Sequence, residues 1–446
     1  MRGLTRKQKL SPERPICQTG ILRLSHDGRG VGEVDGKKTF IFGGLPNEVV
    51  SFQYTSVRRR LDEGRAIDIT MPSPFRTAPH CAHFGVCGGC QLQHLEPEAQ
   101  LEHKQAVMLE QLQHLGGVTP REVLAPLTGP LWGYRRKARL GVRFVQKKNK
   151  LLIGFRERQA NKLADLSECS ILVPEFGSLI PDLQRLIAGL AGFEVIPQIE
   201  ISVGTGPDER GLVIRHLAPL SESDVDKLKA FAKTNQICLF LQAKGPESVQ
   251  CLWPDPDKRF LSYILEPYHL KFEFHPSDFT QVNHEMNEQM VARALSLLEP
   301  KSTDRILDLF CGIGNFSLPL AMQAEKVVGV EGHAEAVRRA QHNATLNQIE
   351  NVQFYAQDLT KPLDPAWASA QYDLVLLDPP RSGALEMMPH LVAWGPRRIL
   401  YISCQPATMA RDAAILVESG YQLVKAGVMD MFPHTAHVES LALFEK

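Results

Sequence analysis

The chain has 446 residues, of which 43% are hydrophobic and 22% are charged, and its formal net charge at neutral pH is zero. These values are typical of an ordinary soluble globular protein with two or three domains. We find no run of 18 apolar residues and no charged-then-apolar amino terminus, so we expect a cytoplasmic protein without a membrane partner. Nine cysteines in such a chain are not a disulfide framework.

The zero net charge hides an uneven distribution. Residues 1–150 contain 24 Lys and Arg against 13 Asp and Glu, a net charge of +11, whereas the remaining residues carry −11. A basic front part suggests contact with a polyanion such as nucleic acid, although a merely solvated basic surface accounts for the charge equally well.

The first 74 residues contain two different kinds of sequence. Residues 1–14 are basic, polar and without periodicity, which indicates a flexible arm. From 15 to 74, short alternating segments such as TGILRLS and KKTFIFGG are separated by glycine turns, a pattern that predicts a small closed β-barrel. The stretch DGRGVGEVDGKKTFIFGGLPNEVV resembles the TRAM domain, an OB-like module of RNA-modifying enzymes. Asn47 replaces the usual glycine of its turn, and asparagine tolerates the left-handed conformation.

Residues 75–278 are expected to form a central α+β domain. Its segment 96–117 has apolar residues near helical spacing, early acids and a glycine stop, which predict a helix that is a candidate to pack on the catalytic domain. Runs such as KARLGVRFV and CLFLQAK then predict strands. From 279 to 446 strands and helices alternate, which predicts a Rossmann-like α/β domain with a parallel sheet.

The segment DRILDLFCGIGNFSLPLA places a glycine turn between a strand and a helix, where free N–H groups can face a ligand. Glu331 ends the next strand, where it can accept hydrogen bonds from ribose hydroxyls, and Asp358 follows the third, where it can meet an adenine amine. The phosphate-binding glycine pattern is incomplete, which argues against a dinucleotide. These features resemble class I S-adenosylmethionine-dependent methyltransferases; a Rossmann-like domain without a ligand is the alternative.

Two further strand ends carry reactive groups. The fourth strand ends in Asp378-Pro379-Pro380-Arg381, and the fifth leads into ISCQPAT, which contains Cys404. A free cysteine is more often a small buried hydrophobe, but adjacent strand ends would bring Cys404 to the same crevice as Asp378. Glu439 precedes the last strand and completes a set of groups suited to covalent catalysis.

The motifs together resemble the RNA uracil-C5 methyltransferase family over nearly the whole chain. The matching segments are Phe279-Thr280-Gln281-Val282-Asn283, the loop 308–316, Asp378-Pro379-Pro380-Arg381, Ser403-Cys404, Asp430-Met431-Phe432-Pro433-His434-Thr435 and His437-Val438-Glu439. The resemblance implies that Cys404 is the nucleophile and Glu439 the base. It also implies that S-adenosylmethionine contacts Gln281, Phe310, Asn315, Glu331, Asp358 and Asp378.

Uracil chemistry explains these residue types. Uracil C5 is too weak a nucleophile to take a methyl group unaided, so thiolate addition at C6 must first make C5 an enolate carbon. A carboxylate then removes the C5 proton and the cysteine is eliminated. Because a duplex hides C6, the uridine must be flipped out or lie in a loop.

Four of the nine cysteines are candidate ligands of a metal group. Cys81, Cys87 and Cys90 cluster in CAHFGVCGGCQ, and Cys169 follows in LSECSIL. Four thiolates are suited to zinc or an iron–sulfur cluster, and three clustered ligands with a distant fourth favour the cluster. The resemblance implies a [4Fe–4S] cluster, which we expect to be structural or to position RNA.

The TRAM segment and the cysteine set together point to the branch of the family that acts on 23S rRNA, and we expect a monomer. Basic clusters at Arg58-Arg59-Arg60, Arg135-Arg136-Lys137-Arg139 and Lys147-Lys148 should bind phosphates. The rival hypotheses are a tRNA uracil-C5 methyltransferase, a cytosine-C5 RNA methyltransferase and a non-catalytic RNA-binding iron–sulfur module.

Overall fold

The computed structural model describes residues 15–158, 160–255, 257 and 260–446. The described chain divides into two compact units. The first contains the chain up to Val107 together with His434–His437, and the second contains Met108–Pro433 and Val438–Lys446. The flexible arm predicted at 1–14 lies outside the described residues.

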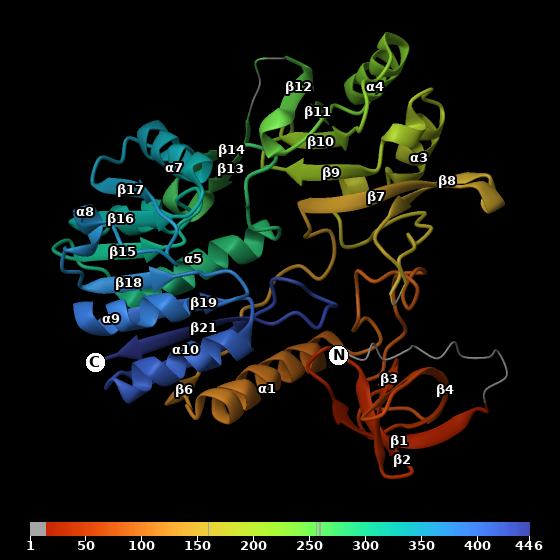
Figure 1. The fold of residues 1–446 in the computed structure, drawn as a ribbon, viewed down its shortest axis with the longest axis horizontal. Helices are drawn as coiled ribbons and strands as arrows, with labels where there is room; N and C mark the ends of the chain where they lie inside the picture. Colours follow the sequence, from red (N-terminus) through yellow and green to blue (C-terminus); the bar gives the residue numbers. More distant parts are fainter. Residues whose placement is uncertain (1–14, 159, 256, 258–259) are drawn as a thin grey trace, which may run out of the picture. The chain divides into compact units, whose positions relative to one another are not determined.

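The first unit contains a closed five-stranded barrel, as the alternating segments predicted (Figure 1). Its strand order is β1-β2-β3-β5-β4, and β4 pairs back onto β1. The interior is filled by Ile21, Ile41, Val50 and Phe52. The strands are β1 (Cys17–Leu24), β2 (Gly30–Val34), β3 (Lys37–Phe42), β4 (Val49–Val57) and β5 (Asp62–Met71).

The turn before β4 ties the barrel to the chain that follows it. Asn47 adopts a φ of 67°, the left-handed conformation expected for this position. The buried carboxylate of Glu48 accepts hydrogen bonds from the backbone N–H groups of Leu45 (2.7 Å) and Ser73 (2.9 Å) and forms an ion pair with Arg76. Burial alone would raise the pKa of Glu48, but Arg76 and the two N–H groups hold it below its usual value.

The second unit begins with a six-stranded sheet in the order β12-β11-β10-β9-β7-β8. Its pairings are antiparallel except between β10 and β11. The strands are β7 (Lys137–Val145), β8 (Lys150–Gly154), β9 (Gln198–Val203), β10 (Arg210–Arg215), β11 (Cys238–Gln242) and β12 (Val249–Trp253). The helices among them are α2 (Pro174–Gly177), α3 (Ile180–Ala188) and α4 (Glu222–Thr234), with short 3-10 turns at Gln146–Lys148, Phe193–Val195 and Pro246–Ser248.

The second sheet of this unit has eight strands in the order β17-β16-β15-β18-β19-β21-β20-β6, which confirms the predicted Rossmann-like architecture (Figure 1). The first five strands run parallel, and β21 enters antiparallel to β19. The strands are β6 (Glu122–Val123), β15 (Arg305–Leu309), β16 (Lys326–Glu331), β17 (Val352–Ala356), β18 (Leu374–Leu377), β19 (Arg398–Ser403), β20 (Gln422–Met429) and β21 (Glu439–Glu445).

Helices pack along this sheet and bury the apolar residues of its strands. α5 contacts β19, α7 contacts β16 and β17, and α10 contacts β20 and β21. Strands β15 and β18 are almost wholly buried, as expected for parallel strands covered on both faces. The helices are α5 (His284–Leu298), α6 (Ser317–Ala321), α7 (Ala334–Leu346), α8 (Pro365–Ala368), α9 (Met388–Trp394) and α10 (Pro406–Glu418), with a 3-10 turn at Leu385–Met387.

A two-stranded hairpin, β13 (Leu261–Leu265) and β14 (Leu270–Phe274), joins the six-stranded sheet to the eight-stranded sheet; a 3-10 turn at Glu266–Tyr268 connects the two strands. On one side its backbone bonds the β9–β10 turn, where Thr205 N–H donates to Ser262 O (3.1 Å). On the other side Asn343 of α7 bonds both the N–H and the carbonyl of Glu273. The hairpin therefore links the two sheets of this unit.

The helix predicted at 96–117 is α1 (Pro97–Gly116). Its last residue, Gly116, lies so close to the backbone of Ala410 in α10 that a Cβ there would come within 2.3 Å of the Ala410 oxygen. Among the described residues, no helix is both long enough and apolar enough to cross a bilayer.

Candidate active site

The loop that follows β15 is turned tightly against the neighbouring strand. Phe310 has a φ of 64°, a conformation that costs a bulky residue strain, and Gly312 and Gly314 are also left-handed. The N–H groups of Phe310 and Cys311 donate to the carbonyl of Val330 at 2.8 and 3.1 Å. This loop therefore crosses the ends of β15 and β16, where the sequence predicted a ligand site.

Glu331 and Asp358 follow neighbouring strands but have different surroundings. The Glu331 carboxylate accepts hydrogen bonds from the backbone N–H groups of Gly312 (3.2 Å) and His333 (2.9 Å). Asp358 is exposed, and its carboxylate accepts from the N–H and the hydroxyl of Thr360. The bonds from Thr360 hold the pKa of Asp358 below its usual value. Both carboxylates are thus oriented by local bonds.

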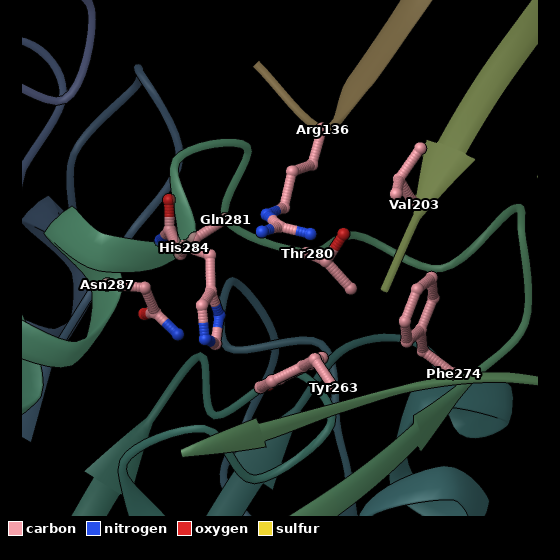
Figure 2. A pocket seen from close by; sticks show the side chains of 8 residues that line it. All are labelled: Arg136, Val203, Tyr263, Phe274, Thr280, Gln281, His284 and Asn287. Atoms are coloured by element: carbon pink, nitrogen blue, oxygen red, sulfur yellow. The ribbon is translucent and has the colours of Figure 1, made fainter. Parts of the chain in front are cut away.

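Asn315, at the carboxyl end of the loop, is held by side chains of other elements. The Asn315 amide forms two reciprocal hydrogen bonds with the amide of Asn287 on α5, at 2.8 and 2.9 Å. The hydroxyl of Tyr263 on β13 also donates to Asn315 Oδ1 at 2.9 Å. Gln281, Asn287 and Tyr263 line one small hollow with Arg136 and His284 (Figure 2).

Asp308 is a buried acid near the end of β15, the strand that leads into the loop. Its Oδ2 accepts a hydrogen bond from Ser317, while its Oδ1 has no hydrogen-bond partner among the described residues. Burial, opposed by the Ser317 bond and reinforced by the charge of Glu331, raises the pKa of Asp308 to about 7. Asp308 was not among the predicted site residues, because it lies in an apolar strand and nothing in the sequence pattern separates it from a structural acid.

Cys404, Asp378 and Glu439 are brought together by the strand register. Leu377 of β18 is paired with Tyr401 of the parallel strand β19, so Asp378 and Cys404, which follow these strands, lie at the same edge of the sheet. Ser403 is paired with Ser440 of β21, which places the first residue of that strand, Glu439, beside Cys404. The strand before Cys404 ends at Ser403, and α10 begins at Pro406.

Burial and mutual repulsion raise the pKa values of two of these groups. The pKa of Cys404 rises to about 11 through burial and the nearby charges of Glu439 and Asp378, while the charge of Arg381 opposes the rise. The pKa of Asp378 rises to about 8 through burial and the charges of Glu439 and Asp308. At neutral pH the free site therefore holds a protonated thiol and a neutral carboxyl that can donate a hydrogen bond.

Helix α10 fixes the loop that contains Arg381 against the loop that contains Cys404. The Asp412 carboxylate is buried and accepts from Tyr401 Oη and from the N–H of Ala384, both at 2.8 Å. Thr408 Oγ1 donates to the carbonyl of Arg381 at 3.2 Å, and Arg411 donates to Ser382 O. Sequence reasoning missed these residues, because an Asp in a helix has no pattern that reveals its burial.

The four cysteines predicted to bind a metal group fall in different units. Cys81, Cys87 and Cys90 lie in one short loop of the first unit, where the N–H of Gly89 donates to Cys87 Sγ at 3.4 Å. Cys169 lies in the second unit. All four lie outside any disulfide and are partly buried. Within the described ranges, no group of three or more His, Cys, Asp or Glu side chains is arranged to hold a metal ion.

Comparisons with known proteins relate this arrangement to one enzyme family. Residues 262–446 match the family described as tRNA (Uracil-5-)-methyltransferase. Over the full length, the chain is 50% identical to the 23S rRNA (uracil(1939)-C(5))-methyltransferase of Hahella chejuensis, with 99% of both chains covered. It is also 50% identical to the protein of the same name from Alkalilimnicola ehrlichii, again with 99% of both covered.

A solved structure supports the fold. The crystal structure of Pyrococcus abyssi tRNA (uracil-54, C5)-methyltransferase in complex with S-adenosyl-L-homocysteine matches with a TM-score of 0.70. The match covers 96% of this chain and 100% of the other at 24% identity. At that identity the likeness concerns the fold alone.

Proposed function

The chain belongs to the family of RNA uracil-C5 methyltransferases, and we infer that it uses S-adenosylmethionine to methylate C5 of a uridine in 23S rRNA. The observation that carries this function is the meeting of Cys404, Asp378 and Glu439 at one sheet edge, in a chain half identical to enzymes of that name. The target is the uridine equivalent to position 1939 in the names of those relatives.

We propose that Cys404 is the nucleophile. Its thiolate adds to C6 of the uracil, and the electron pair of the C5–C6 double bond moves toward the O4 carbonyl to form an enolate. The neutral carboxyl of Asp378 is suited to donate a hydrogen bond to the uracil edge as negative charge develops there. The C5 carbon then attacks the methyl group of the donor, and the donor's C–S bond breaks.

Glu439 is the proposed base of the second half of the reaction. It takes the proton from the methylated C5, the double bond re-forms, and the C6–S bond breaks to release Cys404 as a thiolate. Support comes from the register, which places Glu439 next to Cys404, and from the charge of Glu439 acting on the thiol. The proposed nucleophile and the proposed base thus lie at the ends of two paired strands, β19 and β21.

The donor-binding residues are proposed to be Gln281, Phe310, Asn315, Glu331, Asp358 and Asp378. The bound donor supplies a methyl group activated by a sulfonium charge. The chain fits such a ligand, because its left-handed loop exposes backbone next to two oriented carboxylates. Glu331 would accept from the ribose hydroxyls, and the exposed Asp358 would meet the adenine amine.

The test of this function is a trapped adduct on RNA that carries 5-fluorouridine. Fluorine cannot leave as a proton, so methylation should stop at a covalent enzyme–RNA species. We expect that species with a 23S rRNA fragment and S-adenosylmethionine, and its loss in Cys404→Ala. Cys251→Ala, which removes a buried thiol in the central sheet, is the matched control and should retain it. An equal adduct with Cys404→Ala, or an adduct only with tRNA, would contradict the proposal.

We propose that Cys81, Cys87, Cys90 and Cys169 hold a [4Fe–4S] cluster. The spacing and the N–H···S bond from Gly89 to Cys87 support it, since N–H donors to ligating sulfur are part of such sites. The cluster would supply a structural cross-link, because four protein ligands leave no open iron position for substrate.

RNA would bind the exposed basic runs at 58–60 and 147–148. The target uridine would be flipped out of its helix, and the protein would act as a cytoplasmic monomer.

Metal analysis tests the cluster. Protein purified without oxygen should contain about four iron and four sulfide per chain and absorb visible light broadly. Cys87→Ser should lose iron, whereas Cys17→Ser, which changes a cysteine in β1, should keep it. Zinc without iron or sulfide in the wild type would overturn the assignment.

A further inference from the structure

The side chain of Asn315 has almost no freedom in this structure. Its Oδ1 accepts two hydrogen bonds, from Tyr263 Oη and Asn287 Nδ2, and its Nδ2 donates to Asn287 Oδ1. A carbonyl oxygen has two lone pairs, so both acceptor positions of the Asn315 amide are used. One N–H of Asn315 remains without a partner among the described residues.

The two partners are themselves immobilised. Tyr263 is 8% exposed and stacks on Phe272, with the ring centroids 5.0 Å apart and the planes at 6°. Asn287 is 3% exposed and lies one turn into α5, whose N-cap is the buried Asn283. Burial also raises the pKa of Tyr263, so its hydroxyl stays protonated and remains a donor.

The charge in the hollow beside the two partners of Asn315 selects among the groups of the methyl donor. Arg136 lines the same hollow as Tyr263 and Asn287 (Figure 2). A cationic guanidinium and an N–H donor disfavour the ammonium and sulfonium groups of S-adenosylmethionine. Its ribose hydroxyls are assigned to Glu331. The α-carboxylate is the remaining group that combines negative charge with acceptor oxygens.

We propose that Tyr263 and Asn287 are positioning residues that hold Asn315 with its free N–H toward the methyl donor, where it binds the donor's α-carboxylate. This inference rests on the proposed function, because it assumes S-adenosylmethionine at this loop. It assigns the carboxylate end of the donor to the Arg136 side of the hollow. It also gives the β13–β14 hairpin a role. Strand β13 is bonded to the β9–β10 turn through Ser262, and its Tyr263 orients Asn315 in the donor site.

The test compares two ligands in four proteins. Binding of S-adenosylmethionine and of its decarboxylated analogue is measured by calorimetry with wild type, Tyr263→Phe, Asn287→Ala and Tyr268→Phe. Tyr268 belongs to the turn of the same hairpin, so Tyr268→Phe removes a hydroxyl nearby without touching Asn315. Circular dichroism and thermal unfolding show whether each variant is folded.

In the wild type, removal of the carboxylate should weaken binding roughly 10- to 100-fold, as expected for a hydrogen bond to a charged group. Tyr263→Phe and Asn287→Ala should weaken S-adenosylmethionine about 5- to 10-fold but leave the decarboxylated analogue within about twofold. Tyr268→Phe should match the wild type for both ligands. Only a link between these residues and the carboxylate produces this selective loss.

Two results would overturn the inference. One is that folded Tyr263→Phe weakens both ligands equally, which would indicate a general structural effect. The other is that both variants bind both ligands as the wild type does. If instead the wild type fails to bind S-adenosylmethionine at all, the proposed function fails, and that outcome is separate from the first two.

Discussion

Two halves of the sheet's carboxyl edge, the donor edge at β15, β16 and β17 and the reaction edge at β18, β19 and β21, treat carboxylates in opposite ways. At the β15–β16–β17 edge, Glu331 and Asp358 accept hydrogen bonds from backbone and hydroxyl donors. At β18, β19 and β21, burial and the charges of Glu439 and Asp308 raise the pKa of Asp378 to about 8. Acids held by hydrogen bonds suit the binding of a ligand, whereas a carboxyl whose pKa is raised by burial and neighbouring charge can exchange a proton near neutral pH.

Burial and the carboxylates of the reaction edge also raise the pKa of the Cys404 thiol. Cys404 shares its surroundings with the same carboxylates, and its pKa rises to about 11 in place of the lower value that a nucleophile needs. The exposed Arg381 is the neighbouring charge that opposes the rise. The reaction edge therefore keeps the nucleophile protonated, and the approach of positive charge or a rise in pH should activate it.

The largest expected effect is on the pH dependence of adduct formation. Because the thiol pKa is about 11, the thiolate fraction and the adduct rate should rise about tenfold from pH 6 to 7, and less steeply toward pH 8, where the Asp378 carboxyl begins to ionise. Arg381→Gln should slow the reaction roughly three- to tenfold at each pH, because it removes the opposing charge. Rapid quenching of reactions with 5-fluorouridine RNA measures both.

The control for that series is Arg338→Gln, which removes an exposed cation paired with Glu335 on α7. It should leave the adduct rate unchanged. A rate that is flat from pH 6 to 8 in the wild type would show that the thiol is already ionised, and the contrast between the two edges would not extend to the nucleophile.

A second prediction concerns stability. The folded pKa of Asp378, about 8, lies above its ordinary value of 3.8, so folding is penalised where the unfolded chain has ionised and the folded one has not. The free energy of unfolding should therefore fall as the pH rises from about 4 to about 8. Asp378→Asn stays neutral and should stabilise the protein by about 1–2 kcal/mol at pH 8, after allowance for solvent screening, with little change at pH 4.

Urea unfolding at the two pH values measures this difference. Asp226→Asn, an exposed acid on α4, should change stability at neither pH. If Asp378→Asn destabilises the protein at pH 8, then the carboxyl is held by favourable bonds, and the reaction edge resembles the donor edge after all.

The sequence predicted those features that follow from local pattern and from general rules of sheet topology. The alternating segments specified the barrel, and the helix expected at 96–117 is present as Pro97–Gly116. The meeting of Asp378 with Cys404 was predictable because parallel strands end at one edge.

Contacts between distant segments were not predictable. Tyr263 reaches Asn315 across 52 residues, and its bond depends on where the hairpin lies. Asp412 is an acid in a helix whose burial follows from the packing of α10. Asp308 lies in an apolar strand, and only its buried, unpartnered oxygen shows that it differs from a structural acid.

The smallest expected effects separate the two acids of the donor edge. Glu331 is held by two backbone N–H groups, so Glu331→Gln turns one acceptor into a donor that faces Gly312 or His333. Binding of S-adenosylhomocysteine should weaken about tenfold, which corresponds to one lost hydrogen bond to a charged group. Asp358 is exposed and bonded locally to Thr360, so Asp358→Asn should weaken binding by no more than about threefold. Calorimetry at two salt concentrations measures both. A larger loss with Asp358→Asn than with Glu331→Gln would mean that exposure does not set the strength of these contacts, and that the adenine end of the ligand contributes more than the ribose.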